Sequence, residues 1–266
     1  MTWTVKVMSL VLKSIEGSLG IITLNNPEKR NCLSAALIGE FCTVLDEFEK
    51  AGVRVVILRG APGVKVWCSG FDVNELSQPG RDPLPYAGTF GLLLRRVQNY
   101  PGPVIAMIEG SVWGGGCDLA LTCDILVGSE TASFTVTPAK IGIPYTASGM
   151  IHFINILGLN KAKEMFFTAS PVNAHDALNV GFLNHLVPAS DLERFTRELA
   201  KKIIENAPLA VKVFKEQFTL LSKGHSIDAE TGERIQSLRR IVYDSKDYGE
   251  GIQAFHEKRP PRFKGK

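Results

Sequence analysis

Two glycine-containing runs carry the residue types that stabilise a developing negative charge. They are CSGFD at residues 68–72 and EGSVWGGGCD at residues 109–118. Each follows an apolar, strand-like run and leads into a helical pattern. Glycine allows close approach to the backbone, and the first N–H groups of a helix have no internal partner. Two such junctions can supply two donors to one oxyanion, although a tight strand-to-helix turn explains either run alone equally well.

The elements that must position these runs alternate between strand and helix. Apolar runs predict strands over residues 20–24, 53–59, 104–108 and 124–127, and amphipathic patterns predict helices over residues 35–50, 73–76, 89–99 and 117–122. Ser34 is the predicted N-cap of the first of these helices. This alternation predicts an α/β fold of stacked βα units with largely parallel strand pairing.

The pattern changes after Pro188. Amphipathic helices are predicted over residues 191–206, 210–223, 229–243 and 248–258, with no linker before them. We therefore divide the chain into a core over residues 1–190 and a helical region over residues 191–266. Such a region either packs on a neighbouring subunit or forms a lid on its own chain. The loop over residues 77–85, with three prolines and a glycine, is a candidate border of the active site.

Composition limits the class of protein. The chain has 266 residues, 45% hydrophobic and 21% charged, with a net charge of +3. The hydrophobic and charged fractions indicate a packed globular protein. The small net charge gives no sign of the basic surface that binding to nucleic acid needs. No segment resembles a signal peptide or a membrane span, so we expect a cytoplasmic location.

The cysteines and histidines give no pattern typical of a metal or disulfide site. The five cysteines are odd in number and form no CxxC pair, which predicts reduced thiols; they are Cys32, Cys42, Cys68, Cys117 and Cys123. The histidines lack metal-ligand spacing, so no metal is expected; they are His152, His175, His185, His225 and His256. No GxGxxG run follows a strand, which argues against a nicotinamide cofactor.

In their order, the two glycine runs resemble the signatures of the crotonase (enoyl-CoA hydratase/isomerase) superfamily. TLNNPEKRNCLS at residues 23–34 and AFHEKR at residues 254–259 fit the same family, so the resemblance extends from about residue 8 to the end. It implies a crotonase-like spiral of ββα units. It also implies that the helical C-terminal region builds a trimer or a dimer of trimers and helps to close the CoA pocket.

Four runs are similar to a bacterial branch of the superfamily that decarboxylates methylmalonyl-CoA. They are GRDPL at 80–84, GSVWGG at 110–115, GIPY at 142–145 and FTASP at 167–171. Members of the superfamily stabilise a thioester enolate. By residue match, the two backbone donors are the N–H groups of Phe71 and Gly115. At the position that matches Phe71, the resemblance implies a histidine in a close decarboxylase and an alanine in many hydratases. Phenylalanine at this position therefore supplies no imidazole, but its backbone N–H can still be a donor.

The resemblance favours decarboxylation over water addition. Hydratases of the superfamily use two glutamates; the first position matches Asp118 and the second falls near Pro138, in a run without glutamate. Asp118 is either a first-turn acid favoured by the helix dipole or a pocket carboxylate whose role stays open. Thr137 and Tyr145 match positions near the substrate carboxylate. Tyr145 can hold that carboxylate or deliver a proton, although the residues alone favour a half-buried loop tyrosine.

The remaining candidate residues are substrate-binding by residue match. They are Lys29, Arg30, Cys68, Gly70, Trp113, Gly114, Phe255 and Lys258. A Lys-Arg pair alone would be a solvated surface. The predicted function is decarboxylation of a short branched malonyl-CoA, methylmalonyl-CoA to propionyl-CoA, with no cofactor beyond the CoA of the substrate and no nucleic-acid or membrane partner. The alternatives are an enoyl-CoA hydratase or isomerase and a non-catalytic acyl-CoA-binding protein.

Overall fold

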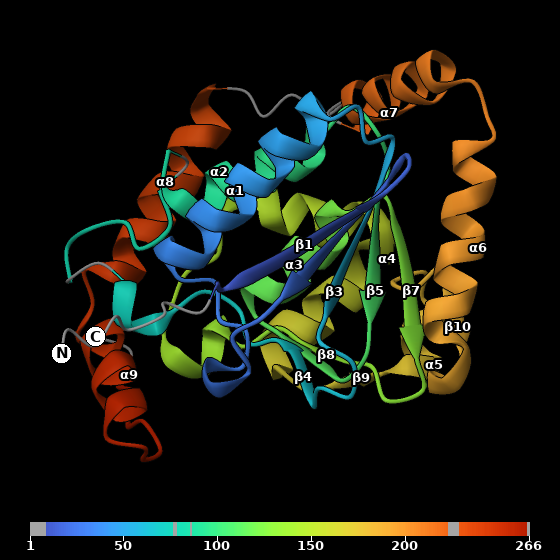
Figure 1. Ribbon diagram of the computed structural model, residues 1–266. Helices are drawn as coiled ribbons and strands as arrows, with labels where there is room; N and C mark the ends of the chain where they lie inside the picture. The colour runs from blue at the N-terminus through green and yellow to red at the C-terminus, as the bar shows by residue number, and fades with distance from the viewer. Residues whose placement is uncertain (1–8, 77–78, 86, 223–228, 265–266) are drawn as a thin grey trace, which may run out of the picture.

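The computed structural model describes residues 9–76, 79–85, 87–222 and 229–264 and contains two β-sheets (Figure 1). The larger sheet has the order β1-β2-β3-β5-β7-β10 and the smaller sheet β4-β6-β8-β9. Pairs β1–β2 and β8–β9 are antiparallel, and the other neighbours are parallel. The predicted α/β class with largely parallel pairing is confirmed.

The strands are short. Their bounds are β1 Val11–Glu16, β2 Leu19–Leu24, β3 Val55–Gly60, β4 Val66–Cys68, β5 Val104–Ile108, β6 Ser111–Trp113, β7 Ile125–Ser129, β8 Ser133–Thr135, β9 Val172–Asn173 and β10 His185–Val187. The sequence prediction did not include β1, β6, β8, β9 or β10; five of the six residues of β1 are exposed, so its pattern is not that of a core strand.

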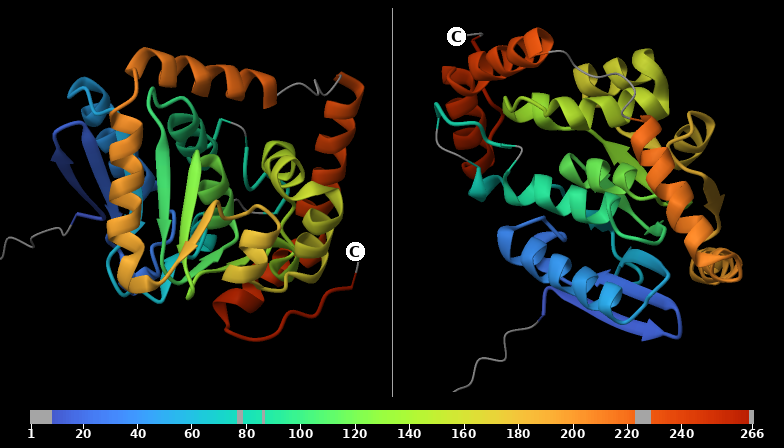
Figure 2. Two further views of the ribbon diagram at one scale, coloured as in Figure 1. Left: turned by 90° about the vertical axis from the view of Figure 1, so that its right-hand side faces the viewer. Right: turned by 90° about the horizontal axis from the view of Figure 1, so that it is seen from above.

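The central strand β3 is buried on both faces. Val56 and Leu58 enter one hydrophobic core, whereas Val55 and Ile57 enter a second core that includes Leu192 of α6. Successive side chains of a strand point to opposite faces, so a strand covered on both sides is a continuous apolar run. Burying each such side chain contributes about 1.5–3 kcal/mol. Figure 2 shows α6 against one face of this sheet, with α1 and α2 on the other side.

The helices of the core position the glycine runs. Their bounds are α1 Ala35–Lys50, α2 Thr89–Gln98, α3 Gly115–Thr122, α4 Ala147–Thr168 and α5 Ala174–Asn179, with one-turn 3-10 helices η1 Pro27–Lys29, η2 Val73–Glu75, η3 Pro138–Ile141 and η4 Ala189–Asp191. The predicted N-cap of α1 is confirmed, because the Ser34 hydroxyl accepts the Leu37 N–H at 3.3 Å. The predicted helix over residues 73–76 is only the turn η2. Helix α3 starts two residues earlier than predicted, and Gly158 (φ 74°) breaks α4.

The four C-terminal helices are α6 Leu192–Ile204, α7 Pro208–Ser222, α8 Ala229–Tyr243 and α9 Lys246–His256. They lie close to the predicted ranges, and Lys223 is outside the described residues. Helix α8 is hydrogen-bonded to the predicted border loop. Arg239 donates to the Asp82 carboxylate and to the Leu84 carbonyl, and the Gly80 N–H donates to the Tyr243 carbonyl at 3.0 Å. Residues 77 and 78 of that loop also lie outside the described part.

Within the described ranges, no helix is both long and apolar enough to cross a membrane. The same ranges contain no cluster of three or more His, Cys, Asp or Glu side chains placed to hold a metal ion. All five cysteines are free thiols, and Cys68, Cys117 and Cys123 are buried. Burial raises the pKa of the Cys68 thiol to about 12, so this thiol stays protonated at neutral pH.

Candidate active site

Two parallel neighbouring strands bring the glycine runs together. Strands β4 and β6 pair in the smaller sheet, and each is followed within two residues by a glycine with positive φ, Gly70 at 89° and Gly114 at 49°. A Cβ atom at Gly70 would lie 2.7 Å from the Trp113 carbonyl oxygen and 2.9 Å from the Gly115 nitrogen. Real Cβ atoms do not approach backbone so closely, so only glycine allows the two turns to meet.

The N–H groups of Phe71 and Gly115 lie side by side at this junction. A Cβ atom at Gly115 would be 3.3 Å from the Phe71 nitrogen. The surrounding backbone groups are paired: Leu33 N–H donates to the Gly70 carbonyl at 2.8 Å, and Gly114 N–H donates to the Thr135 carbonyl at 2.8 Å. Phe71 and Gly115 themselves donate to no group in the described part of the chain. Two adjacent free donors form the geometry of an oxyanion hole.

Two phenylalanines cover this pair of donors. The rings of Phe71 and Phe90 pack edge to face, with centroids 5.9 Å apart. The tip of the Phe90 ring would lie 3.0 Å from a Cβ atom at Gly115. Phe90 belongs to α2, which carries no chemical signal in the sequence, so the prediction did not include it. The two rings make the surroundings of the donors apolar, which strengthens a hydrogen bond to a charged oxygen.

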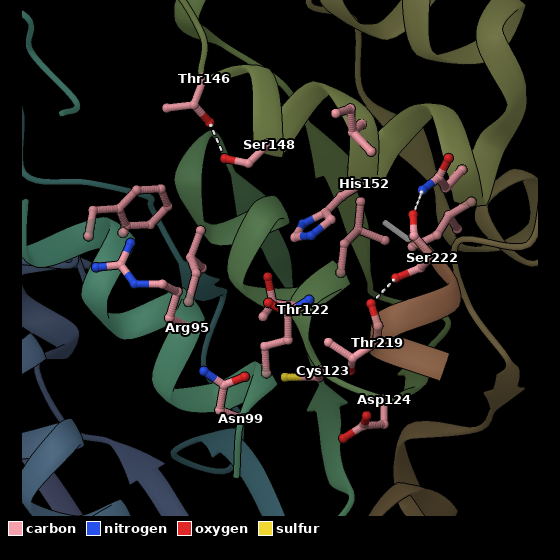
Figure 3. A pocket seen from close by; sticks show the side chains of 18 of the residues that line it. Arg95, Asn99, Thr122, Cys123, Asp124, Thr146, Ser148, His152, Thr219 and Ser222 are labelled. Carbon is pink, nitrogen blue, oxygen red and sulfur yellow. Dashed lines mark hydrogen bonds between the residues drawn. The ribbon is translucent and has the colours of Figure 1, made fainter. Parts of the chain in front are cut away.

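A cavity of about 1520 Å³ lies next to the two rings. It is lined by residues of α2, the end of α3, α4 and α7, and Figure 3 shows part of its wall. Phe71 is the one predicted site residue among its described lining residues. Gly115 is not among these residues, so the cavity approaches the two donors only through Phe71 and Phe90.

Asp118 is the single acidic side chain in the first turn of α3 and is completely buried. Its Oδ1 atom lies 3.2 Å from Nδ1 of His152 on α4. Its Oδ2 atom has no hydrogen-bond partner of ordinary geometry among the described residues. The prediction treated His152 as a scattered histidine, because only the tertiary fold brings α4 across α3.

Tyr145 lies on the other side of the Asp118 carboxylate. A Cβ atom at Gly149 would be 2.5 Å from Cε1 of Tyr145 and 2.7 Å from Oδ2 of Asp118, so this glycine makes room for both. The Tyr145 hydroxyl is buried and forms no hydrogen bond of ordinary geometry within the described ranges. Burial and then the nearby Asp118 carboxylate raise the pKa of Tyr145 well above its usual value. The hydroxyl therefore keeps its proton.

The smaller predicted contacts surround the glycine turn. The Thr137 hydroxyl would lie 3.2 Å from a Cβ atom at Gly114. The Cys68 thiol accepts the Gly70 N–H at 3.4 Å. The Trp113 indole N–H donates to Ser111 at 2.8 Å. These three predicted residues therefore lie next to the glycine turns that carry the two free donors.

The four residues predicted to hold CoA fall into two separate pairs. Lys29 and Arg30 are exposed in and just after η1, and the Arg30 carbonyl accepts the Ser69 N–H at 3.0 Å, which holds this loop beside the first glycine run. Phe255 is 48% exposed near the end of α9, and Lys258 follows that helix. No hydrogen bond or ion pair joins the two pairs in the described part of this chain.

Comparisons with known proteins identify the family. The family model described as enoyl-CoA hydratase/isomerase matches residues 14–266. The chain is 41% identical over 247 residues to the methylmalonyl-CoA decarboxylase of Escherichia coli (strain K12), covering 93% of this chain and 95% of that protein. It is 32% identical over 252 residues to a short-chain-enoyl-CoA hydratase of Clostridium acetobutylicum, covering 94% of this chain and 95% of that protein.

A solved structure leads to the same family. The structure of methylmalonyl-CoA decarboxylase in complex with 2-nitronate-propionyl-CoA has a TM-score of 0.94 and 40% sequence identity, and it covers 97% of this chain and 99% of that chain. The family match spans nearly all of the sequence, both glycine runs included. The chain therefore belongs to the enoyl-CoA hydratase/isomerase family, the crotonase superfamily.

Proposed function

We propose that this protein decarboxylates a short branched malonyl-CoA, converting methylmalonyl-CoA to propionyl-CoA. The observation that carries the proposal is a pair of free backbone donors beside one buried carboxylate instead of two. Decarboxylation needs a group that takes up the negative charge of an enolate, whereas hydration needs acid–base groups for water and the α-carbon. The run from Phe134 to Lys140, where hydratases of the superfamily carry their second glutamate, contains no acidic residue.

In this mechanism, the thioester oxygen accepts hydrogen bonds from the N–H groups of Phe71 and Gly115. The bond between the α-carbon and the leaving carboxylate breaks, and its electron pair becomes the enolate. The rings of Phe71 and Phe90 keep water from the oxyanion, so both donors act in an apolar environment. The buried Tyr145 hydroxyl then protonates the α-carbon to give propionyl-CoA.

CoA binding and assembly belong to the same proposal. The exposed Lys29 and Arg30 pair with the CoA phosphates, and Phe255 and Lys258 complete the pocket from a neighbouring copy of the chain. The surface of helix α7 favours assembly with other copies of the chain, because it exposes large apolar side chains. Leu209 is 77% exposed, Phe218 72% and Leu221 75%. Several large exposed apolar side chains on one helix are typical of a protein–protein contact.

Hydration of an enoyl-CoA is the second candidate, favoured by the 32% identity to the Clostridium hydratase. Asp118 would then have to activate water without a second acid. The test is a panel of malonyl-, methylmalonyl-, ethylmalonyl- and crotonyl-CoA, with product masses followed over time. Loss of CO2 from methylmalonyl-CoA with little hydration of crotonyl-CoA supports the decarboxylase. Rapid formation of 3-hydroxybutyryl-CoA would assign the hydratase.

A further inference from the structure

Three polar side chains lie next to one another here: His152, Asp118 and Tyr145. Of these three, only His152 lines the cavity. Figure 3 shows its imidazole pointing from α4 into this space. Its side chain is 26% exposed, whereas that of Asp118 is fully buried. The Tyr145 hydroxyl is also buried. A proton that leaves Tyr145 for the substrate must be replaced, and His152 is the member of this group that meets the cavity.

The contacts of the three groups follow one another in that order. Nδ1 of His152 lies 3.2 Å from Oδ1 of Asp118, and Oδ2 of Asp118 and Cε1 of Tyr145 both border Gly149. Oδ2 of Asp118 and the Tyr145 hydroxyl are both buried, and the Asp118 carboxylate is near enough to help raise the pKa of Tyr145. The carboxylate and the hydroxyl are therefore neighbours inside the protein, and His152 links them to the cavity.

We propose that His152 is a positioning residue that orients Asp118 and relays solvent protons through it to Tyr145. This inference rests on the proposed function, because it assumes that Tyr145 protonates a thioester enolate. Histidine suits the role, since its two ring nitrogens can bind a proton on one side and release one on the other. Nδ1 faces Asp118, which leaves Nε2 for the cavity.

The proton balance of the relay is closed. The Tyr145 hydroxyl proton forms the new C–H bond at the α-carbon, which leaves a phenolate. Nε2 of His152 takes a proton from water, and Nδ1 releases its proton to Asp118. Asp118, protonated on Oδ1, turns about its Cβ–Cγ bond and passes this proton to the phenolate. One solvent proton enters and one proton reaches carbon, so the three side chains recover their original charges, and His152 exchanges its Nε2 proton with solvent to return to the Nδ1–H tautomer before the next turnover.

The test follows exchange of the α-hydrogens of propionyl-CoA in D2O by mass spectrometry, which reports proton delivery without requiring CO2 loss. His152→Asn keeps an amide N–H for Asp118 but cannot carry a proton. General acid–base groups typically contribute about 10²–10⁴-fold. We expect His152→Asn to slow exchange at least tenfold with KM within twofold of wild type. The exposed His175 on α5 provides the control. The His175→Asn variant should exchange the α-hydrogens of propionyl-CoA at the wild-type rate.

A loss smaller than tenfold in folded His152→Asn, or no exchange by the wild type, would overturn the relay. If His152→Asn does not fold, His152→Gln is measured by the same criterion. Adding imidazole to His152→Ala separates a relay from packing: at least fivefold recovery of exchange is expected, and no recovery would contradict the relay. Failure of the proposed function has a different signature, namely His152-dependent exchange by an enzyme that releases no CO2 from methylmalonyl-CoA.

Discussion

Adding one methyl group to Gly115 tests the oxyanion hole most sharply. In Gly115→Ala the new Cβ would lie 3.3 Å from the Phe71 nitrogen and 3.0 Å from the tip of the Phe90 ring. The ring is a side chain and can move by a few tenths of an ångström. Gly115 is the first residue of α3 and has no positive φ, so alanine fits its backbone. The methyl group therefore occupies space beside both donors without unfolding the protein.

The expected loss follows from the number of donors affected. Removing one oxyanion-hole donor typically lowers kcat by about 10²–10³, or about 3–4 kcal/mol. The alanine methyl hinders approach to the Phe71 donor while the Gly115 N–H remains, so we expect a loss within this range. The assay is kcat/KM for CO2 release from methylmalonyl-CoA, with thermal unfolding measured on the same samples.

A matched control is available in α1. A Cβ atom at Gly39 would have no neighbour within 4 Å, so Gly39→Ala should leave kcat/KM unchanged. It should also stabilise the helix by up to about 1 kcal/mol, because alanine has the higher helix propensity. If Gly115→Ala retains full folding and more than a fifth of wild-type activity, the two N–H groups do not bind the thioester oxygen.

Four further predictions concern separate parts of the molecule. Tyr145→Phe should lower kcat at least tenfold with little change in KM; wild-type kcat would exclude it as the proton donor. Lys215→Met should lower the free energy of unfolding in urea by about 3 kcal/mol, because Lys215 is buried and pairs with Asp124 at 2.8 Å; a change below 1 kcal/mol would contradict this. Hydrogen bonds from Arg259 and then from a backbone N–H lower the pKa of Glu250 from its usual 4.5 to about 2. The contribution of these hydrogen bonds to stability should be complete above pH 4.5 and lost as the pH falls through about 2. This loss should be seen in hydrogen exchange of the C-terminal segment, and Glu250→Gln should abolish it. Light scattering should give a trimer or hexamer of the 29.1 kDa chain, and a monomer at micromolar concentration would refute the assembly.

The sequence predicts well where local patterns determine structure. The continuous apolar runs identify β2, β3, β5 and β7, because these strands are covered on both faces. Strand β1 was missed because its exposed edge position gives no apolar run. Helix α4 and its break at Gly158 were not part of the prediction, and η2 is only one turn long although its pattern predicted a helix.

The candidate site divides in the same way. The glycine runs point to the backbone donors, because Gly70 and Gly114 both have a positive φ and Gly70 also lies too close to neighbouring backbone for a side chain. Phe90 and His152 act through contacts between elements distant in the sequence, so neither has a local signal. Which copy of the chain supplies Phe255 and Lys258 also depends on assembly, and their roles stay predictions.

The central claim is that the paired donors and the single carboxylate make this protein a decarboxylase. The most direct measurement is the ratio of kcat/KM for CO2 release from methylmalonyl-CoA to kcat/KM for hydration of crotonyl-CoA, with both products identified by mass. The mechanism predicts propionyl-CoA as the main product and a ratio of at least about 10², because hydration lacks one of its acid–base groups. A ratio below one, with 3-hydroxybutyryl-CoA as the main product, would contradict it.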